Sequence, residues 1–276
     1  MIITLTTDFG AEDGYVGTMK GVMLGIAPEA TLVDITHAIA PQDVRQAAYV
    51  LWTCLPYFPQ DSVHLVVVDP GVGTSRRPIA SETAWGLLVG PDNGVFSYVG
   101  EAAPPHLTVV LAERRYQRQV VSSTFHGRDV FAPAAAHLAM GVPLKELGPV
   151  VDAPIRLPTP RLDIETDRVV GEILHVDRFG NAISSIGRLI WEGGILHLDP
   201  AFGDRSAHLL NARRFRVRVA GRDVGPVRHT YGEVPVGSPL ALVGSEGMLE
   251  IAVNQRHGAS VLDVHVGDMV ELVAVS

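Results

Sequence analysis

The sequence predicts an α/β N-terminal domain with a mainly parallel sheet flanked by helices, followed by a smaller all-β C-terminal domain, an antiparallel sheet or barrel. Two observations support this prediction. The first 70 residues alternate between short β-branched runs and helical periods, an order typical of parallel sheets. Beyond about residue 160 the chain instead shows short strands separated by glycine-containing turns, with no long helix between them.

The first half of the chain supplies the alternating elements. Its predicted elements are, in order, residues 2–7 (strand), 12–26 (helix), 31–35 (strand), 43–57 (helix), 64–68 (strand), 85–89 (strand) and 131–139 (helix). Pro28 and Pro59 end the first two helices, because proline cannot continue a helix. The strand at His64–Val68 is fully apolar and is therefore predicted to be central in the sheet.

The second half supplies only strands. They are predicted at residues 169–176, 196–198, 214–219, 239–243, 249–253 and 269–273. The proline-rich stretch around Pro154, Pro158 and Pro160 has the composition of a linker. We therefore predict an α/β domain over 1–155, a linker over 156–165 and a β-rich domain over 166–276.

Composition excludes several classes of protein. The formal net charge is −8, from 22 basic and 30 acidic residues, which disfavours nucleic acid as a partner. Cys54 is the single cysteine, so no internal disulfide can form, as expected in a reducing compartment. The sequence shows no signal peptide and no apolar run of about 18 residues. We expect a cytoplasmic protein that does not bind membranes.

Two aspartates follow predicted strands directly. Asp8 ends the first strand and Asp69 ends the central one. In open α/β sheets, ligands bind outside the carboxyl ends of the strands, so both positions are candidate site residues. Asp8, next to Gly10, could bind a ribose diol; alternatively, Asp8 or Asp13 caps the helix that begins near Gly14.

The segment 69–77, Asp-Pro-Gly-Val-Gly-Thr-Ser-Arg-Arg, is a second candidate. Its glycines let backbone approach a ligand, and Arg76 can fold back to pair with Asp69. It lacks the Gly-Lys-Ser/Thr ending of a phosphate loop. The alternative is a tight turn closed by a surface ion pair.

His126 lies beside Gly127 at the entrance to the alanine-rich helix, where it could serve as acid, base or ligand. The alternatives are a structural histidine and, for Asp129, an N-cap carboxylate. His126 and Asp129 make at most half a metal site, and no other cluster has metal-ligand spacing. We expect no metal and no cofactor.

Two turns in the second half carry polar side chains beside glycine. They are Asp177-Arg178-Phe179-Gly180-Asn181 and the segment that begins Gly244-Ser245-Glu246-Gly247. Each is either only a turn or part of a site for a polar small molecule.

Taken together, these segments resemble the S-adenosylmethionine (SAM) hydroxide adenosyltransferases, which are adenosine-forming SAM hydrolases related to fluorinases and chlorinases. The matching stretches are TTDFG..DGYVG.MKG at 6–21, DPGVGT.RR at 69–77, GPDNG at 90–94, TFHGRD.FAP at 124–133, D.FGN at 177–181 and SEG.LEIA at 245–252. They occur in order across nearly the whole chain.

The resemblance implies a homotrimer with each active site between the N-terminal domain of one subunit and the C-terminal domain of its neighbour. It implies a water-holding triad of Asp69, Arg76 and His126, with Asp8 on the ribose hydroxyls. It implies the remaining substrate contacts at Asp177 and Ser245 for the methionine part, and at Asn181, Phe179, Tyr231 and the backbone near Val253 for adenine. The adjacent Glu246 is expected to be a further substrate-binding residue.

Two departures from the fluorinase pattern favour water over halide as the nucleophile. Asp69 and His126-Gly127 stand where a fluorinase has a tyrosine and, after the Thr-Phe-Tyr run, a serine; the loop inserted ahead of the Asn-Gly turn is also absent. A carboxylate repels a halide anion but accepts a hydrogen bond from water. We therefore predict hydrolysis of SAM to adenosine and methionine, with the base left open between Asp69 and His126. The alternatives are a halide-dependent nucleoside synthase and a non-catalytic adenosine-binding protein.

Overall fold

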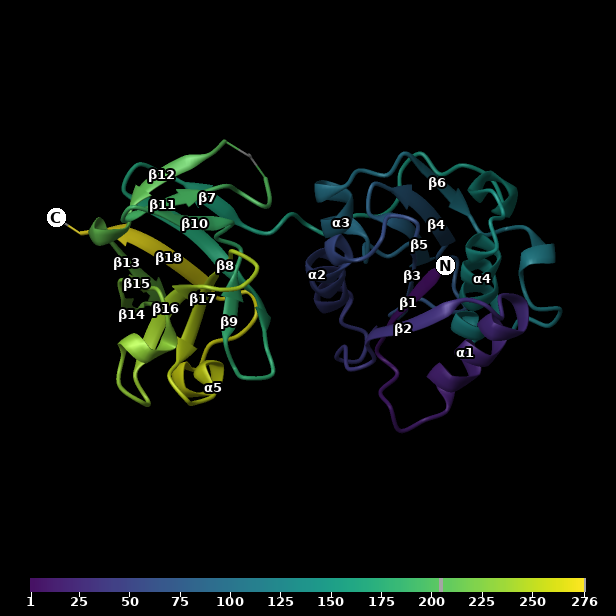
Figure 1. The fold of residues 1–276 in the computed structure, drawn as a ribbon, viewed down its shortest axis with the longest axis horizontal. Coiled ribbons are helices and arrows are strands. Elements are labelled where there is room, and N and C mark those ends of the chain that lie inside the picture. Colours follow the sequence, from purple (N-terminus) through teal and green to yellow (C-terminus); the bar gives the residue numbers. More distant parts are fainter. Residues whose placement is uncertain (204–205, 276) are drawn as a thin grey trace. The chain divides into compact units, whose positions relative to one another are not determined.

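The structure, a computed structural model that describes residues 1–203 and 206–275, divides the chain into two units, residues 1–157 and 158–276 (Figure 1). The first unit contains β1 (Ile2–Thr7), α1 (Tyr15–Ile26), β2 (Thr31–Thr36), α2 (Val44–Cys54), β3 (Val63–Val67), β4 (Pro78–Thr83), β5 (Gly86–Pro91), α3 (Ser97–Ala102), β6 (Leu107–Val110) and α4 (Ala132–Ala139). A π-helical turn, Gly127–Phe131, leads into α4.

One six-stranded sheet, in the order β2-β1-β3-β5-β4-β6, organises the first unit. Helices α1 and α4 pack together over one face, and α2 and α3 cover the other (Figure 1). All of β3 is buried, as predicted for a central strand with helices on both sides. Ile3, Leu5 and Leu65 are fully buried and form the core with α1 and α4.

The sheet is mixed, which corrects the expectation of a mainly parallel one. Strands β2, β1, β3 and β5 run parallel, but β4 is antiparallel to both β5 and β6. The register of β4 and β5 pairs Thr83 with Gly86, which leaves a two-residue connection. So short a connection can only join antiparallel strands.

The second unit is β-rich. It contains β7 (Leu162–Ile164), β8 (Arg168–Val176), β9 (Ala182–Ser184), β10 (Leu189–Glu192), β11 (Ile195–Leu198), β12 (His208–Asn211), β13 (Phe215–Val219), β14 (Arg222–Gly225), β15 (Val227–Arg228), β16 (Pro239–Val243), β17 (Leu249–Val253), α5 (Gly258–Leu262) and β18 (Met269–Ala274). The main sheet runs β14-β13-β18-β8-β9-β17-β16-β15 and nearly closes into a barrel, because β14 also contacts β16. The strand β7 lies inside the segment predicted as linker and pairs with β8.

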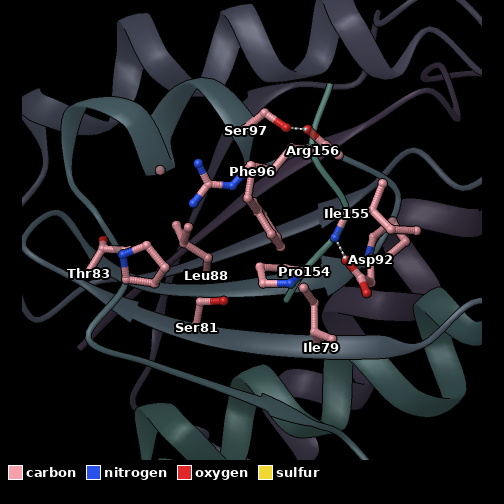
Figure 2. Close-up of a pocket in the computed structure, with 14 residues that line it drawn as sticks. Ile79, Ser81, Thr83, Leu88, Asp92, Phe96, Ser97, Pro154, Ile155 and Arg156 are labelled. Atoms are coloured by element: carbon pink, nitrogen blue, oxygen red, sulfur yellow. Dashed lines mark hydrogen bonds between the residues drawn. The ribbon is translucent and has the colours of Figure 1, made fainter. Parts of the chain in front are cut away.

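The end of the first unit packs on its own sheet. The Ile155 amide donates to Asp92 Oδ1 at 2.7 Å, and Arg77 Nη2 donates to the Ala153 carbonyl at 2.8 Å. Figure 2 shows this segment beside the residues of β4 and β5 that line a cavity with it. The volume of this cavity is about 40 Å³. A cavity of this size holds a few waters at most, so it is no substrate site. Among the described residues, no helix is long and apolar enough to cross a membrane.

Candidate active site

Asp8 and Asp69 stand at the same edge of the first sheet. Strands β1 and β3 are parallel neighbours with Thr7 opposite Val67, and each aspartate follows within two residues. Asn93, from the next strand exit, donates through Nδ2 to the Val68 carbonyl at 2.9 Å and thereby fixes the backbone next to Asp69. The N-cap of α1 is Gly14, without any side-chain cap, so neither Asp8 nor Asp13 serves as the cap.

Arg76 binds both carboxylate oxygens of Asp69 through one edge of its guanidinium. Arg76 Nε donates to Asp69 Oδ1 at 3.0 Å, and Arg76 Nη2 donates to Asp69 Oδ2. The two side chains are only 6% and 5% exposed, so this is not the surface ion pair of the alternative interpretation. A bidentate bond of this kind holds a carboxylate in one orientation.

His126 joins the pair through the same guanidinium. Arg76 Nη2 lies 3.1 Å from His126 Nδ1. Arginine has no acceptor, so His126 Nδ1 must accept, and the ring is neutral with its proton on Nε2. Burial and the Arg76 charge both lower the pKa of His126, which stabilises this neutral form. The structure thus brings together the three residues predicted as a triad.

A close contact between two loops places His126 beside Arg76. Gly73 has φ +77°, and a Cβ there would lie 2.4 Å from the Ser123 carbonyl oxygen. Asp129 holds the second loop in place. Its fully buried carboxylate accepts a hydrogen bond from the Ser122 amide at 2.9 Å and pairs with Arg128. Asp129 lies within the π-helical turn and two residues before the N-cap Phe131 of α4, so it is not the predicted cap.

A cluster of aromatic rings adjoins this triad through Phe125, the residue before His126. Phe9, Tyr15 and Phe125 contact one another with ring centroids 5.3–5.9 Å apart. The Arg76 guanidinium lies over the Phe131 ring, 5.2 Å from its centroid. Asp8 is partly exposed next to Phe9, and its Oδ2 accepts the Gln42 amide at 2.8 Å. Asp8 therefore keeps one oxygen for a ligand.

In the second unit, Asp177 and Asn181 form a tight turn after β8. Asp177 Oδ1 accepts the backbone amides of Phe179 and Asn181 at 2.9 and 2.8 Å. Asp177 Oδ2 accepts Asn181 Nδ2 at 3.0 Å. The turn leaves the Phe179 ring 76% exposed, an unusual position for a large aromatic side chain.

Phe179 and Asn181 border a cavity of about 490 Å³. It is lined by Phe179, Asn181, Tyr231, Val253, Gln255, Arg256 and His257. The four residues predicted to contact adenine are therefore neighbours around one cavity. Its size and its mixture of two aromatic rings with an amide suit a flat heteroaromatic ligand.

Ser245 and Glu246 lie elsewhere in the second unit. They occupy the turn between β16 and β17, whereas Val253 ends β17 on the cavity side. Neither residue is among those that line the cavity, and Asp177 is not among them either.

Glu250 is a residue that sequence reasoning missed. It is 8% exposed within β17, and it accepts the hydroxyl of Tyr231 through Oε1. A Cβ on Gly244 would lie 2.8 Å from Glu250 Oε2, so the other carboxylate oxygen faces the Ser245 turn. The available signal was an acidic residue inside an otherwise apolar strand. Gln255, Arg256 and His257 also escaped prediction, because nothing in the sequence marks a cavity wall.

No group of three or more histidine, cysteine, aspartate or glutamate side chains within 1–203 and 206–275 could hold a metal ion. The groups described above are suited to hydrogen bonding, charge stabilisation and proton transfer.

Comparison with known proteins extends this picture. Models of the N- and C-terminal domains of the SAM hydroxide adenosyltransferases match residues 3–148 and 171–271. A Thermus thermophilus protein named (R)-S-adenosyl-L-methionine hydrolase is 43% identical over 96% of this chain and 97% of its own length. A fluorinase from an Actinoplanes species is 29% identical over 92% of this chain and 91% of its own.

The crystal structure of an uncharacterized conserved protein from Thermotoga maritima has the same fold, with a TM-score of 0.84 at 35% identity. The similarity covers 99% of this chain and 100% of that one. The class of protein is thus defined by two units: a mixed α/β unit with Asp8 and Asp69 at one edge of its sheet, and a β-rich unit whose main sheet nearly closes into a barrel. The chain belongs to the SAM hydroxide adenosyltransferase family, which confirms the resemblance found in its motifs.

Proposed function

We propose that this protein hydrolyses (R)-SAM to adenosine and methionine. The observation that carries the proposal is the buried Asp69–Arg76–His126 cluster, in which one guanidinium holds a carboxylate and a neutral imidazole. The name of the Thermus thermophilus relative supports the same reaction. A protein that only binds adenosine has no need of this cluster.

The reaction is an in-line displacement. The water oxygen forms a bond to the ribose 5′ carbon while the bond from that carbon to sulfur breaks. The electron pair of the broken bond stays on sulfur, so methionine leaves as a neutral thioether and needs no acid. One water proton must depart. Catalysis therefore depends on ordering the water at about 3–3.5 Å from the carbon and receiving its proton.

The hydrogen-bond directions suggest how the triad divides this work. With His126 Nδ1 occupied by Arg76, the imidazole presents an N–H at Nε2 and can donate to the water but not accept from it. Asp69 is the remaining acceptor, because a carboxylate keeps lone pairs beyond the two that Arg76 uses. We assign Asp69 as the proton acceptor and His126 as the donor that orients the water.

The remaining assignments concern substrate binding. Asp8 would accept the ribose hydroxyls through its free oxygen, and the cavity beside Phe179 and Asn181 would hold adenine. We propose Asp177 and Ser245 for the methionine part and Glu246 as a further substrate contact. The homotrimer with shared active sites and the absence of a cofactor also stay proposals, testable by light scattering and by turnover after dialysis against EDTA.

Product analysis tests the proposal. Purified protein incubated with (R)-SAM should release adenosine and methionine in equal amounts. Asp69→Ala, Arg76→Ala and His126→Ala should each slow release by at least about a hundredfold. Full turnover in all three variants would remove the triad from the mechanism.

The fluorinase relative makes halide chemistry the second candidate. Adding fluoride or chloride to the same reaction should leave adenosine as the nucleoside product. A 5′-halo nucleoside would favour the second candidate, and tight adenosine binding without methionine release would favour a binding protein.

A further inference from the structure

A chain of hydrogen bonds runs along the wall of the second-unit cavity. It links Asp177 to Asn181, Asn181 to Tyr231 and Tyr231 to Glu250. Glu250 ends this chain behind the cavity wall, since it is buried and is not among the lining residues. Among the described residues Glu250 has no positive partner, and a buried carboxylate without one is costly, so its position in an apolar strand needs an explanation.

The direction of every bond in this chain is fixed at its ends. An ionised carboxylate only accepts, so in the ionised state Asp177 receives the Asn181 Nδ2 proton at 3.0 Å and Glu250 receives the Tyr231 hydroxyl proton. Burial raises the pKa of Glu250, and the bond from Tyr231 offsets part of this rise by stabilising the ionised form. Burial and the Glu250 charge raise the pKa of Tyr231, so its hydroxyl keeps the proton it donates. The Tyr231 oxygen is then left to accept the second Nδ2 proton of Asn181, across 3.4 Å.

At Asn181 and Tyr231, the cavity wall consequently faces its ligand with acceptors. Both Nδ2 protons of Asn181 point along the chain, and no partner among the described residues takes Asn181 Oδ1. The Tyr231 proton points away toward Glu250, so only the lone pairs of its oxygen remain for the cavity. A base edge that carries an amino group fits this arrangement, whereas one that carries a carbonyl would meet two acceptors.

We propose that Glu250 is a specificity-determining residue: by fixing the Tyr231 proton away from the cavity, it makes the site accept a 6-aminopurine and reject a 6-oxopurine. This proposal rests on the proposed function, in which the cavity holds the base of the substrate. Glu250 itself does not touch the ligand and acts through Tyr231.

Glu250→Gln tests this role with almost no change in volume. A glutamine can donate to the Tyr231 oxygen as well as accept from it, so the hydroxyl becomes free to donate into the cavity. The measured quantity is the ratio of kcat/KM for SAM to kcat/KM for S-inosylmethionine, its 6-oxo analogue. We expect wild-type protein to favour SAM and Glu250→Gln to lower the ratio about tenfold.

Two further variants separate this role from a general loss of structure. In a Tyr231→Phe background, Glu250→Gln should leave the ratio unchanged, because Glu250 acts through the missing hydroxyl. Glu271→Gln, which removes a partly buried carboxylate of β18 that pairs with Arg168, should leave the wild-type ratio intact. Thermal melting confirms that each variant folds.

The outcomes distinguish a failure of the role proposed for Glu250 from a failure of the proposed substrate placement. An unchanged ratio in folded Glu250→Gln, with wild-type protein still selective, overturns the role of Glu250 and leaves the proposed function standing. The same holds if Glu250→Gln lowers the ratio equally in the Tyr231→Phe background. If Asn181→Ala and Phe179→Ala leave KM for SAM unchanged, the cavity does not hold the base and the proposed placement of the substrate fails.

Discussion

Arg76 occupies the centre of the candidate active site because a guanidinium offers several donors at fixed angles. It bonds both oxygens of Asp69 and the Nδ1 atom of His126, and its burial excludes competing water. Its Nη1 atom is buried and has no protein partner among the described residues. The position of the proton on His126 thus follows from Arg76, not from His126 itself.

Arg76→Lys should therefore behave almost like Arg76→Ala. A lysine ammonium is a point charge and cannot reproduce the bidentate bond to Asp69 together with the bond to His126 Nδ1. We expect kcat for SAM hydrolysis to fall on the order of a hundredfold, measured by adenosine release. Arg115→Lys is the matched control, because Arg115 is 62% exposed in its pair with Glu146 and should tolerate the change. Activity near wild type in Arg76→Lys would show that its charge alone suffices.

Protonation of His126 should lower kcat/KM only at acidic pH. Its pKa lies below the ordinary 6.5, owing to burial and to Arg76, so the neutral form persists at and above that pH. Protonation at lower pH would place a donor against the Arg76 donor and break their bond. We expect kcat/KM to be level above pH 6.5 and to fall only below it.

His126→Asn checks this explanation, because asparagine can accept from Arg76 but does not titrate. The variant should be slower than wild type yet about tenfold faster than His126→Ala, and its acid limit should be shifted or lost. An unchanged acid limit in His126→Asn would assign that limit to another group.

At the scale of elements, the site depends on how two loops meet. The loop after β3 carries Asp69 and Arg76, and the loop before α4 carries His126. Gly73 lets the first loop touch the backbone of the second at Ser123. The spacing of the triad is therefore set by backbone contact between loops, with Asp129 holding the second loop in place.

Gly73→Ala should separate these loops. The new methyl carbon would meet the Ser123 oxygen at 2.4 Å, and a displacement of about 1 Å costs on the order of a hundredfold in rate. Gly141→Ala is the control: its φ of +87° is equally unfavourable for alanine, but nothing lies within 4 Å of its Cβ position. Equal kcat values in the two variants would contradict a role for the loop contact.

The sequence predicted elements with strong patterns and missed weak ones. Strands β1, β16 and β17 have the predicted bounds, since β-branched and apolar residues dominate them. Strand β4 was missed because Pro78-Ile-Ala-Ser-Glu-Thr mixes small and polar residues. The antiparallel part of the first sheet was missed as a consequence, because it is formed by the pairing of β4 with β5 and β6. Short strands such as β15, only two residues long, leave no periodicity to detect.

The site residues were predictable only where a local sequence pattern marks them. A strand that ends in aspartate marks Asp8 and Asp69 without a structure. The burial of Asp129, the chain from Asn181 to Glu250 and the cavity walls depend on contacts between segments far apart in sequence, such as Tyr231 with Glu250. No local pattern contains that information.

At the scale of the whole molecule, stability should depend on a histidine outside the active site. His64 in β3 is fully buried, between Thr4 Oγ1 at 2.9 Å and the Trp85 carbonyl at 2.9 Å. Burial lowers its pKa from 6.5 to about 4. Because the unfolded chain takes up a proton first, stability is complete above pH 6.5 and is lost as pH falls toward about 4.

We expect this group to remove about 3 kcal/mol of unfolding free energy across that range. Urea unfolding of wild type and His64→Gln at several pH values isolates its share, since the carboxylates titrate in both. The variant should be less stable near neutral pH and lose less stability on acidification. Parallel pH profiles for the two proteins would contradict the assignment.

The central claim is that this protein transfers water oxygen to the 5′ carbon of SAM at the Asp69–Arg76–His126 cluster. Turnover of (R)-SAM in oxygen-18 water, followed by mass spectrometry of both products, tests it most directly. We predict one labelled oxygen in adenosine, none in methionine, and loss of labelled adenosine in Asp69→Ala. Unlabelled adenosine, or undiminished labelling in Asp69→Ala, would contradict the account.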